Sequence, residues 1–229
     1  MTTSPGSAYH ELKAMLALGG CPMCRAAAQS GRRYLDSLLF ESVTDPDIRA
    51  RLEASLGFCA FHHRLMLTFP GERLGVAIIE QALLKEALQR LRRGSGAAAR
   101  SGWRRWLGSG SPSSPPDPCP VCRAEAEAAD RVLSVLLQHL AGDLDQALRQ
   151  AGGLCWPHLS QALALEPDAA TQSALVAAHE AAWAEIVADL GEFIRKRDHR
   201  FRHETISDAE AAAIEKAMAA LSGNVRGDG

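Results

Sequence analysis

The segment Cys21-Pro22-Met23-Cys24-Arg25-Ala26 decides how this sequence is interpreted, because it recurs as Cys119-Pro120-Val121-Cys122-Arg123-Ala124. A second motif follows each copy, as Gly57-Phe58-Cys59-Ala60-Phe61-His62 and as Gly153-Leu154-Cys155-Trp156-Pro157-His158. The copies are offset by 98 residues at the first motif and by 96 at the second. Chance similarity of two helical segments explains matching leucines, but not two matching pairs of Cys-x-x-Cys and Cys-x-x-His. The pattern therefore predicts an internal duplication and a two-lobed protein.

The composition of the 229 residues is that of an ordinary globular protein, with 47% apolar and 23% charged residues. This balance excludes a wholly disordered chain, and the length suits one large domain or two small ones. The net charge of -2 argues on electrostatic grounds against a general nucleic-acid binder, so we expect no nucleic-acid partner. No apolar run approaches the ~20 residues of a transmembrane helix. We therefore expect a cytoplasmic protein, whose thiols stay reduced.

The spacing of apolar residues predicts an all-α fold of two pseudo-symmetric helical lobes, each pinned by a Cys3His metal site. Prolines placed just inside a helix and an acidic residue after Ser207 supply helix-start signals. The predicted helices span 22–41, 72–93, 120–141, 168–199 and 208–221. The predicted organisation is a first repeat over 8–93, a linker rich in Gly, Ser and Pro over 94–118, a second repeat over 119–203, and a short helix and tail over 204–229.

All six cysteines lie inside the four motifs, so each repeat supplies three thiols and one imidazole. The candidate metal ligands are Cys21, Cys24, Cys59 and His62 in the first repeat, and Cys119, Cys122, Cys155 and His158 in the second. Four sulfur and nitrogen donors suit tetrahedral Zn²⁺ and leave no position open for a substrate. The sequence thus predicts two structural zinc ions and a binding or scaffolding protein without catalytic residues. Whether half-sites pair within or across the repeats is left open.

Three other interpretations of the cysteines stay open. An iron–sulfur cluster with three cysteine ligands and one histidine is one of them. A thiol–disulfide couple of Cys21 and Cys24 is another, although no strand precedes the helix as in thioredoxin-like proteins. The third is a set of buried, reduced cysteines without a ligand. The alternative function is accordingly a thiol–disulfide redox or iron–sulfur regulatory protein.

Two basic segments suggest contact with an anionic surface or partner. Trp103, Arg104, Arg105 and Trp106 lie in the linker, where they could touch an anionic membrane or form a short helix docked by its tryptophans. Residues 195–203 could bind an anionic ligand, or form a solvated helix end whose cations suit the helix dipole. We favour the second alternative in each case. The sequence does not identify the expected protein partner.

The motifs also resemble those of an uncharacterised bacterial family of unknown function. The resemblance rests on the forms CPxC and GxCxxH, followed by Phe193-Ile194-Arg195-Lys196-Arg197-Asp198-His199-Arg200-Phe201-Arg202 and a short closing helix. It covers about residues 8–222 without the linker. The family implies a single unit but no established activity.

Overall fold

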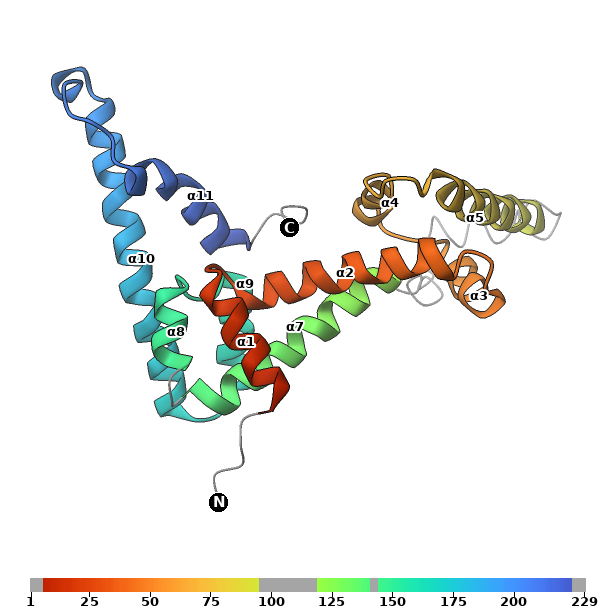
Figure 1. Cartoon of the computed structure of the whole chain (residues 1–229), viewed down its shortest axis with the longest axis horizontal. Coiled ribbons are helices and arrows are strands. Elements are labelled where there is room, and N and C mark those ends of the chain that lie inside the picture. The colour runs from red at the N-terminus through yellow and green to blue at the C-terminus, as the bar shows by residue number, and fades with distance from the viewer. Residues whose placement is uncertain (1–5, 95–118, 141–143, 224–229) are drawn as a thin grey trace. The chain divides into compact units, whose positions relative to one another are not determined.

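A computed structural model describes residues 6–94, 119–140 and 144–223 of the chain (Figure 1). Helices joined by short turns account for these residues, and no strand occurs among them, so the predicted all-α class is confirmed. Within the same residues, no helix is both long enough and apolar enough to cross a bilayer. Most of the predicted linker, with Trp103, Arg104, Arg105 and Trp106, lies outside the described part of the chain, as does the tail after Gly223.

Five of the helices match the predicted ones to within about two residues. The elements in chain order are α1 (Ser7–Ala17), α2 (Pro22–Glu41), α3 (Pro46–Ser55), α4 (Ala60–Met66), α5 (Arg73–Gly94), α7 (Pro120–His139), α8 (Asp145–Gln150), α9 (Trp156–Leu165), α10 (Ala169–Arg197), the 3-10 helix η2 (His199–Phe201) and α11 (Asp208–Ser222). The short helices α1, α3, α4, α8 and α9 were not predicted, because few turns give too little periodicity to recognise.

Local capping explains several of the helix starts. Pro22 and Pro120 occupy the first positions of α2 and α7, where a missing N–H has no cost. The Asp45 side chain accepts hydrogen bonds from two backbone N–H groups at the start of α3. At α11, Ser207 and Glu210 form the predicted capping box, with each side chain accepting from the other residue's backbone N–H.

The chain divides into two compact units whose bounds differ from those of the two predicted repeats. Unit 1 comprises residues 1–28 and 127–229, and unit 2 comprises residues 29–126. The boundaries fall inside α2 and α7, so each of these helices belongs to unit 1 at one end and to unit 2 at the other. Each unit is consequently built from parts of both repeats.

Each unit has its own hydrophobic core. In unit 1, α1 and the start of α2 pack with the second half of the chain, and the buried residues include Leu12, Leu16, Met23, Leu133, Leu136, Leu148, Leu154 and Leu175. The core of unit 2 includes Leu35, Leu38, Leu39, Leu52, Phe58, Met66, Val76, Ile79, Leu83 and Val121. The core of unit 1 thus buries Leu12, Leu16, Cys21 and Met23 among residues of the second half of the chain, and the core of unit 2 buries Val121 among residues of the first half.

Helix α5 buries a different face from the one its leucines suggest. The leucine spacing correctly predicts a helix, but Leu84, Leu88 and Leu91 are exposed. Val76, Ile79 and Leu83 form the buried face instead, in the core of unit 2, and α5 packs against α3. Because α5 carries apolar residues on both faces, periodicity identifies the helix without identifying the stripe that packs.

The adjacent residues Leu83 and Leu84 test this assignment, since their side chains are 5% and 63% exposed. Leu83→Ala should lower the free energy of unfolding by about 2–5 kcal/mol, because it removes buried methyl groups and leaves a cavity. Leu84→Ala should change it by less than about 0.5 kcal/mol. Urea unfolding followed by circular dichroism measures both, and equal losses would contradict the assignment.

Candidate metal centres

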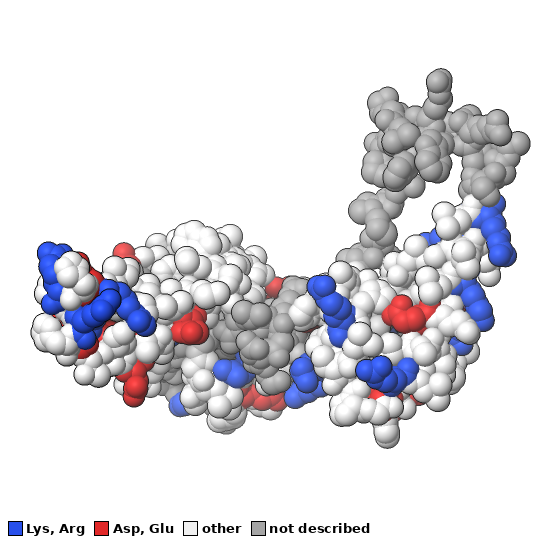
Figure 2. All heavy atoms as spheres, turned by 90° about the horizontal axis from the view of Figure 1, so that it is seen from above, with Lys and Arg blue, Asp and Glu red and all other residues white. Residues whose placement is uncertain are grey.

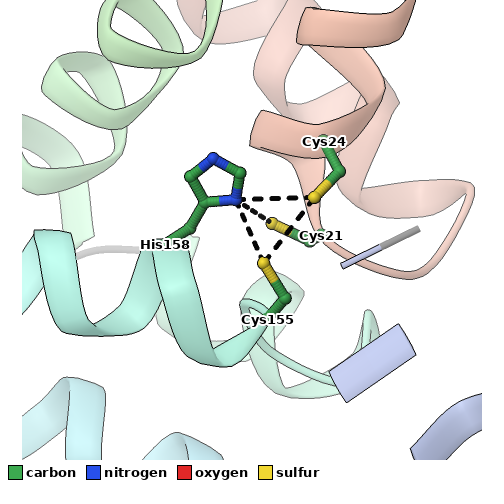
Figure 3. Close-up of side chains that lie close together, drawn as sticks. All are labelled: Cys21, Cys24, Cys155 and His158. Atoms are coloured by element: carbon green, nitrogen blue, oxygen red, sulfur yellow. Dashed lines mark hydrogen bonds between the residues drawn. The ribbon is translucent and has the colours of Figure 1, made fainter. Parts of the chain in front are cut away.

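The first Cys/His group consists of Cys21, Cys24, Cys155 and His158, all in unit 1 (Figure 3). Nδ1 of His158 lies 3.4 Å from the sulfurs of Cys21 and Cys24, and 3.1 Å from that of Cys155. The sulfurs of Cys24 and Cys155 are 3.6 Å apart. The two cysteines of the CPMC motif thus meet the cysteine and histidine of the CWPH motif at one point.

The second group, in unit 2, consists of Cys59, His62, Cys119 and Cys122. Nδ1 of His62 lies 3.2 Å from the Cys59 sulfur, 3.4 Å from that of Cys119 and 3.5 Å from that of Cys122. The sulfurs of Cys59 and Cys122 are 3.7 Å apart. The two groups therefore present the same donor set, with the histidine in both turning Nδ1 toward the sulfurs.

The eight candidate ligands all lie in these two groups, and the pairing of half-sites, which the sequence left open, runs across the two predicted repeats. Each group combines the Cys-x-x-Cys of one repeat with the Cys-x-x-His of the other. The physical reason is that the first turns of α2 are buried in unit 1, whereas Val121 in the first turn of α7 is buried in unit 2. Each Cys-x-x-Cys motif is thereby carried into the unit that contains the other repeat's Cys-x-x-His.

Each group joins the N-terminal ends of two helices. Cys21 and Cys119 directly precede α2 and α7, and their carbonyl oxygens accept the first helical hydrogen bonds, from Arg25 and Arg123. Cys59 and Cys155 are the N-cap residues of α4 and α9. The positive end of a helix favours thiolate over thiol. One helical turn then separates each of these cysteines from the second donor of its motif.

In each group, a histidine that is not a candidate ligand holds the loop that leads to the N-cap cysteine, Cys59 or Cys155. The backbone N–H of Phe58 donates to Nε2 of His63 at 3.2 Å, and that of Leu154 donates to Nε2 of His179 at 2.6 Å. Both loops contain a glycine of the GxC motif with positive φ, Gly57 at 90° and Gly153 at 83°. A Cβ on Gly153 would lie 2.7 Å from the His179 ring. Glycine is thus required both by the backbone and by the ring.

The sequence analysis assigned neither His63 nor His179 to these loops. His63 could have been found from its place beside His62, whereas His179 lies 25 residues from its partner Leu154 and gives no local signal.

The imidazole of the second group has a carboxylate behind it. Nε2 of His62 lies 3.0 Å from Oε1 of Glu125, and the two residues are 0% and 5% exposed. Glu125 in turn lies against Gly31 of α2, where a Cβ would come within 2.5 Å of the same carboxylate oxygen. In the first group His158 is only partly buried. Sequence reasoning missed Glu125, although it stands three residues after Cys122.

Hydrogen bonds within the first group separate the thiol pKa values. Bonds from Cys155 and Cys24 lower the pKa of Cys21 well below its usual range, and bonds with Cys21 and Cys24 raise the pKa of Cys155. Hydrogen bonds to Cys21 and Cys24 raise the pKa of His158 to about 10. These shifts favour negative charge on the Cys21 sulfur and protons on Cys155 and His158.

The second group shows the same division. Burial opposes ionisation of Cys119, but bonds from His62 and from backbone N–H groups outweigh it and lower the pKa to about 6. Burial and the bond to Cys59 raise the pKa of Cys122 to about 12. Burial also disfavours the charged form of His62, yet contacts with Cys119 and Glu125 raise its pKa to about 10. Without a metal ion, protons on Cys122 and His62 thus offset the negative charge that a divalent cation would neutralise.

The distances fit a tetrahedral metal ion. Metal–sulfur bonds of about 2.3 Å and metal–nitrogen bonds of about 2.0 Å place tetrahedral ligand atoms roughly 3.8 Å apart for two sulfurs and 3.5 Å apart for sulfur and nitrogen. The sulfur pairs at 3.6 and 3.7 Å and the sulfur–nitrogen pairs at 3.1–3.5 Å lie near these values. A disulfide needs about 2.05 Å, and all six thiols are free. Each group could therefore hold one metal ion.

Carboxylates neutralise part of the basic segment 195–203. Arg195 forms ion pairs with Glu192 and Glu204, and Lys196 forms one with Glu210 at 2.7 Å. On the face drawn in Figure 2, basic and acidic side chains are interspersed over the described surface. The cations of this segment tie the end of α10 to the chain that follows.

The family comparison covers nearly the whole chain. The sequence model of DUF6062, described as a family of unknown function, matches residues 12–228. This agrees with the resemblance seen in the CPxC and GxCxxH motifs. No curated protein and no solved structure matches the chain.

Gly152 and Gly153 form a matched pair for testing the loop before Cys155. Both have positive φ, 87° and 83°, but only Gly153 lies against His179. Gly152→Ala should cost about 1–2 kcal/mol from the left-handed backbone alone. Gly153→Ala should lose about 1–3 kcal/mol more, because the methyl group displaces the ring. Thermal unfolding measures the difference, and equal midpoints would show that the ring contact is unimportant.

The buried His179 gives a pH-dependent contribution to stability. Burial lowers its pKa below 6.5, and the neutral ring accepts from Leu154 while bonding the Leu175 carbonyl through Nδ1. A depressed pKa contributes stability above the unfolded-state value, which is lost as the pH falls through the folded-state value. The stability advantage of the wild type over His179→Gln should therefore shrink below about pH 6.5. Unfolding at several pH values measures it. The exposed His203→Gln is the control, and an advantage independent of pH would contradict the assignment.

Proposed function

The chain belongs to DUF6062, a family of unknown function, and we propose that it is a helical binding or scaffolding protein stabilised by one zinc ion in each Cys/His group. The observation that carries the proposal is the convergence of three sulfurs and one imidazole nitrogen, twice, at tetrahedral spacing. Three thiolates with one imidazole are a common donor set of structural zinc sites. The ligands in the proposal are Cys21, Cys24, Cys59, His62, Cys119, Cys122, Cys155 and His158.

The zinc ions in this proposal act on folding and not on a substrate. Four protein ligands fill the tetrahedron and leave no place for an activated water. The first group connects residues up to 137 apart in the chain, and the second connects residues up to 63 apart. Bringing such distant segments together has a large entropic cost, which metal binding offsets. The ions would thereby hold the start of α2 to α9 and the start of α7 to α4.

An internal duplication explains why the two donor sets are alike. In this proposal each repeat contains one Cys-x-x-Cys and one Cys-x-x-His. Each metal site combines the Cys-x-x-Cys of one repeat with the Cys-x-x-His of the other. This pairing makes each unit depend on both repeats, so neither repeat completes a metal site alone. The partner we expect is another protein, because two of the cations that an anionic ligand would need, Arg195 and Lys196, already pair with carboxylates of this chain. The proposed place of action is the cytoplasm, where the thiols stay reduced.

Metal analysis of double variants tests both the ligands and their pairing. The wild type should bind two zinc ions, and Cys59→Ser should bind one. Cys24→Ser with Cys155→Ser removes two ligands of the same group and should leave one ion. Cys24→Ser with Cys59→Ser affects both groups and should leave none. Elemental analysis of protein purified without added metal gives the counts.

Three outcomes of this experiment would contradict the proposal. Pairing within repeats would reverse the results of the two double variants. A brown protein containing iron and sulfide would replace zinc by a cluster. A metal-free protein that forms a reversible disulfide would favour redox function, and the 3.6 Å between Cys24 and Cys155 identifies the pair to examine.

A further inference from the structure

We infer that Glu125 is a positioning residue that makes the second group retain its metal ion longer than the first. The inference rests on the proposed function, since it concerns the ligands of that proposal. It distinguishes two groups that have the same ligand types and nearly the same internal distances. The difference between them lies behind the histidine.

The surroundings of His62 leave its ring one orientation. Nδ1 points to the three sulfurs, and Nε2 faces Oε1 of Glu125 at 3.0 Å. With the metal on Nδ1, the proton must be on Nε2, from which it is donated to the carboxylate. A carboxylate behind a metal-bound histidine fixes the tautomer and the ring plane, and makes the ligand nitrogen more basic. The burial of both residues keeps water from competing for this bond.

The backbone around Glu125 is built to accommodate the carboxylate. Gly31 stands in the interior of α2, where glycine costs about 1 kcal/mol relative to alanine. A Cβ at this position would lie 2.5 Å from Oε1, the same oxygen that faces His62. The glycine therefore leaves the space in which the carboxylate reaches the ring. The contact of His62 on α4 and the space left by Gly31 on α2 thus both concern Oε1 of Glu125.

The first group lacks this arrangement. At the repeat offset of the CPxC motifs, the position of Glu125 is taken by Ala27. His158 is partly buried, and over the described residues no hydrogen bond joins its Nε2 to another group. Burial of the sulfurs does not favour the second group, since Cys21 and Cys155 of the first group are buried and the three cysteines of the second group are partly exposed. The carboxylate behind His62 is therefore the feature that distinguishes the second group as the tighter site.

Kinetics of zinc release from the full-length protein measure the difference. With two ions bound, excess EDTA and a zinc indicator should reveal one fast and one slow phase. Cys24→Ser should abolish the fast phase, and Cys59→Ser the slow one. Glu125→Gln should accelerate the slow phase by about 10–100-fold and leave the fast phase unchanged, as expected for loss of a supporting carboxylate. Glu127→Gln removes the same charge from an exposed position of α7 and should change neither phase.

A second variant separates positioning from general stability. Gly31→Ala favours α2 as a helix but displaces the carboxylate, so it should also accelerate the slow phase. Cobalt-loaded protein gives an independent signal, because a reoriented imidazole changes the visible bands of the second group. The same bands should be unchanged in Glu127→Gln.

The outcomes separate the inference from the proposed function. Two bound ions with a single release phase would overturn the inference and leave the proposed function intact. The inference would also be wrong if both Glu125→Gln and Gly31→Ala released zinc at the wild-type rate. Failure to bind any metal would overturn the proposed function and the inference together.

Discussion

The crowding of three sulfurs and one imidazole nitrogen, repeated in two units, is the constraint on which the rest of the structure depends. Such a group is unstable as a set of charges, since adjacent thiolates repel each other and burial disfavours them. The pKa values of Cys119 and Cys122, about 6 and about 12, show how far the sulfurs must differ when only protons are shared. A divalent cation would remove this conflict by accepting all four donors.

The positions of the two groups explain the course of the chain. Helices α2 and α7 each begin at a Cys-x-x-Cys motif in one unit and end in the other. Residues 22–28 therefore pack with the second half of the chain, whereas residues 120–126 pack with the first. The remaining helices are short except for α5 and α10, so each unit has a modest core of its own. A metal ion would contribute most where segments far apart in sequence must meet.

The two groups share a common plan at the N-cap cysteines and differ at the histidines. In both, a glycine with positive φ brings the chain against a second histidine, which accepts the N–H of the residue before the cysteine. In the part of the chain that the structure describes, a buried carboxylate lies behind His62 and none lies behind His158. Similar donor sets placed in different surroundings give a protein two sites that need not exchange metal at the same rate.

The sequence by itself determined the helical class, the approximate limits of the long helices and the eight candidate ligands. These depend on local signals, such as 3.6-residue periodicity, Ser207 and Glu210 at a helix start, and Cys-x-x-Cys spacing across one turn. Only the tertiary structure decided which half-sites meet, which stripe of α5 is buried, and that Glu125, Gly31 and His179 support the groups. Their contacts join residues 25 to 137 positions apart. Periodicity carries no information about such pairs, because it specifies a helix face but not the partner that covers it.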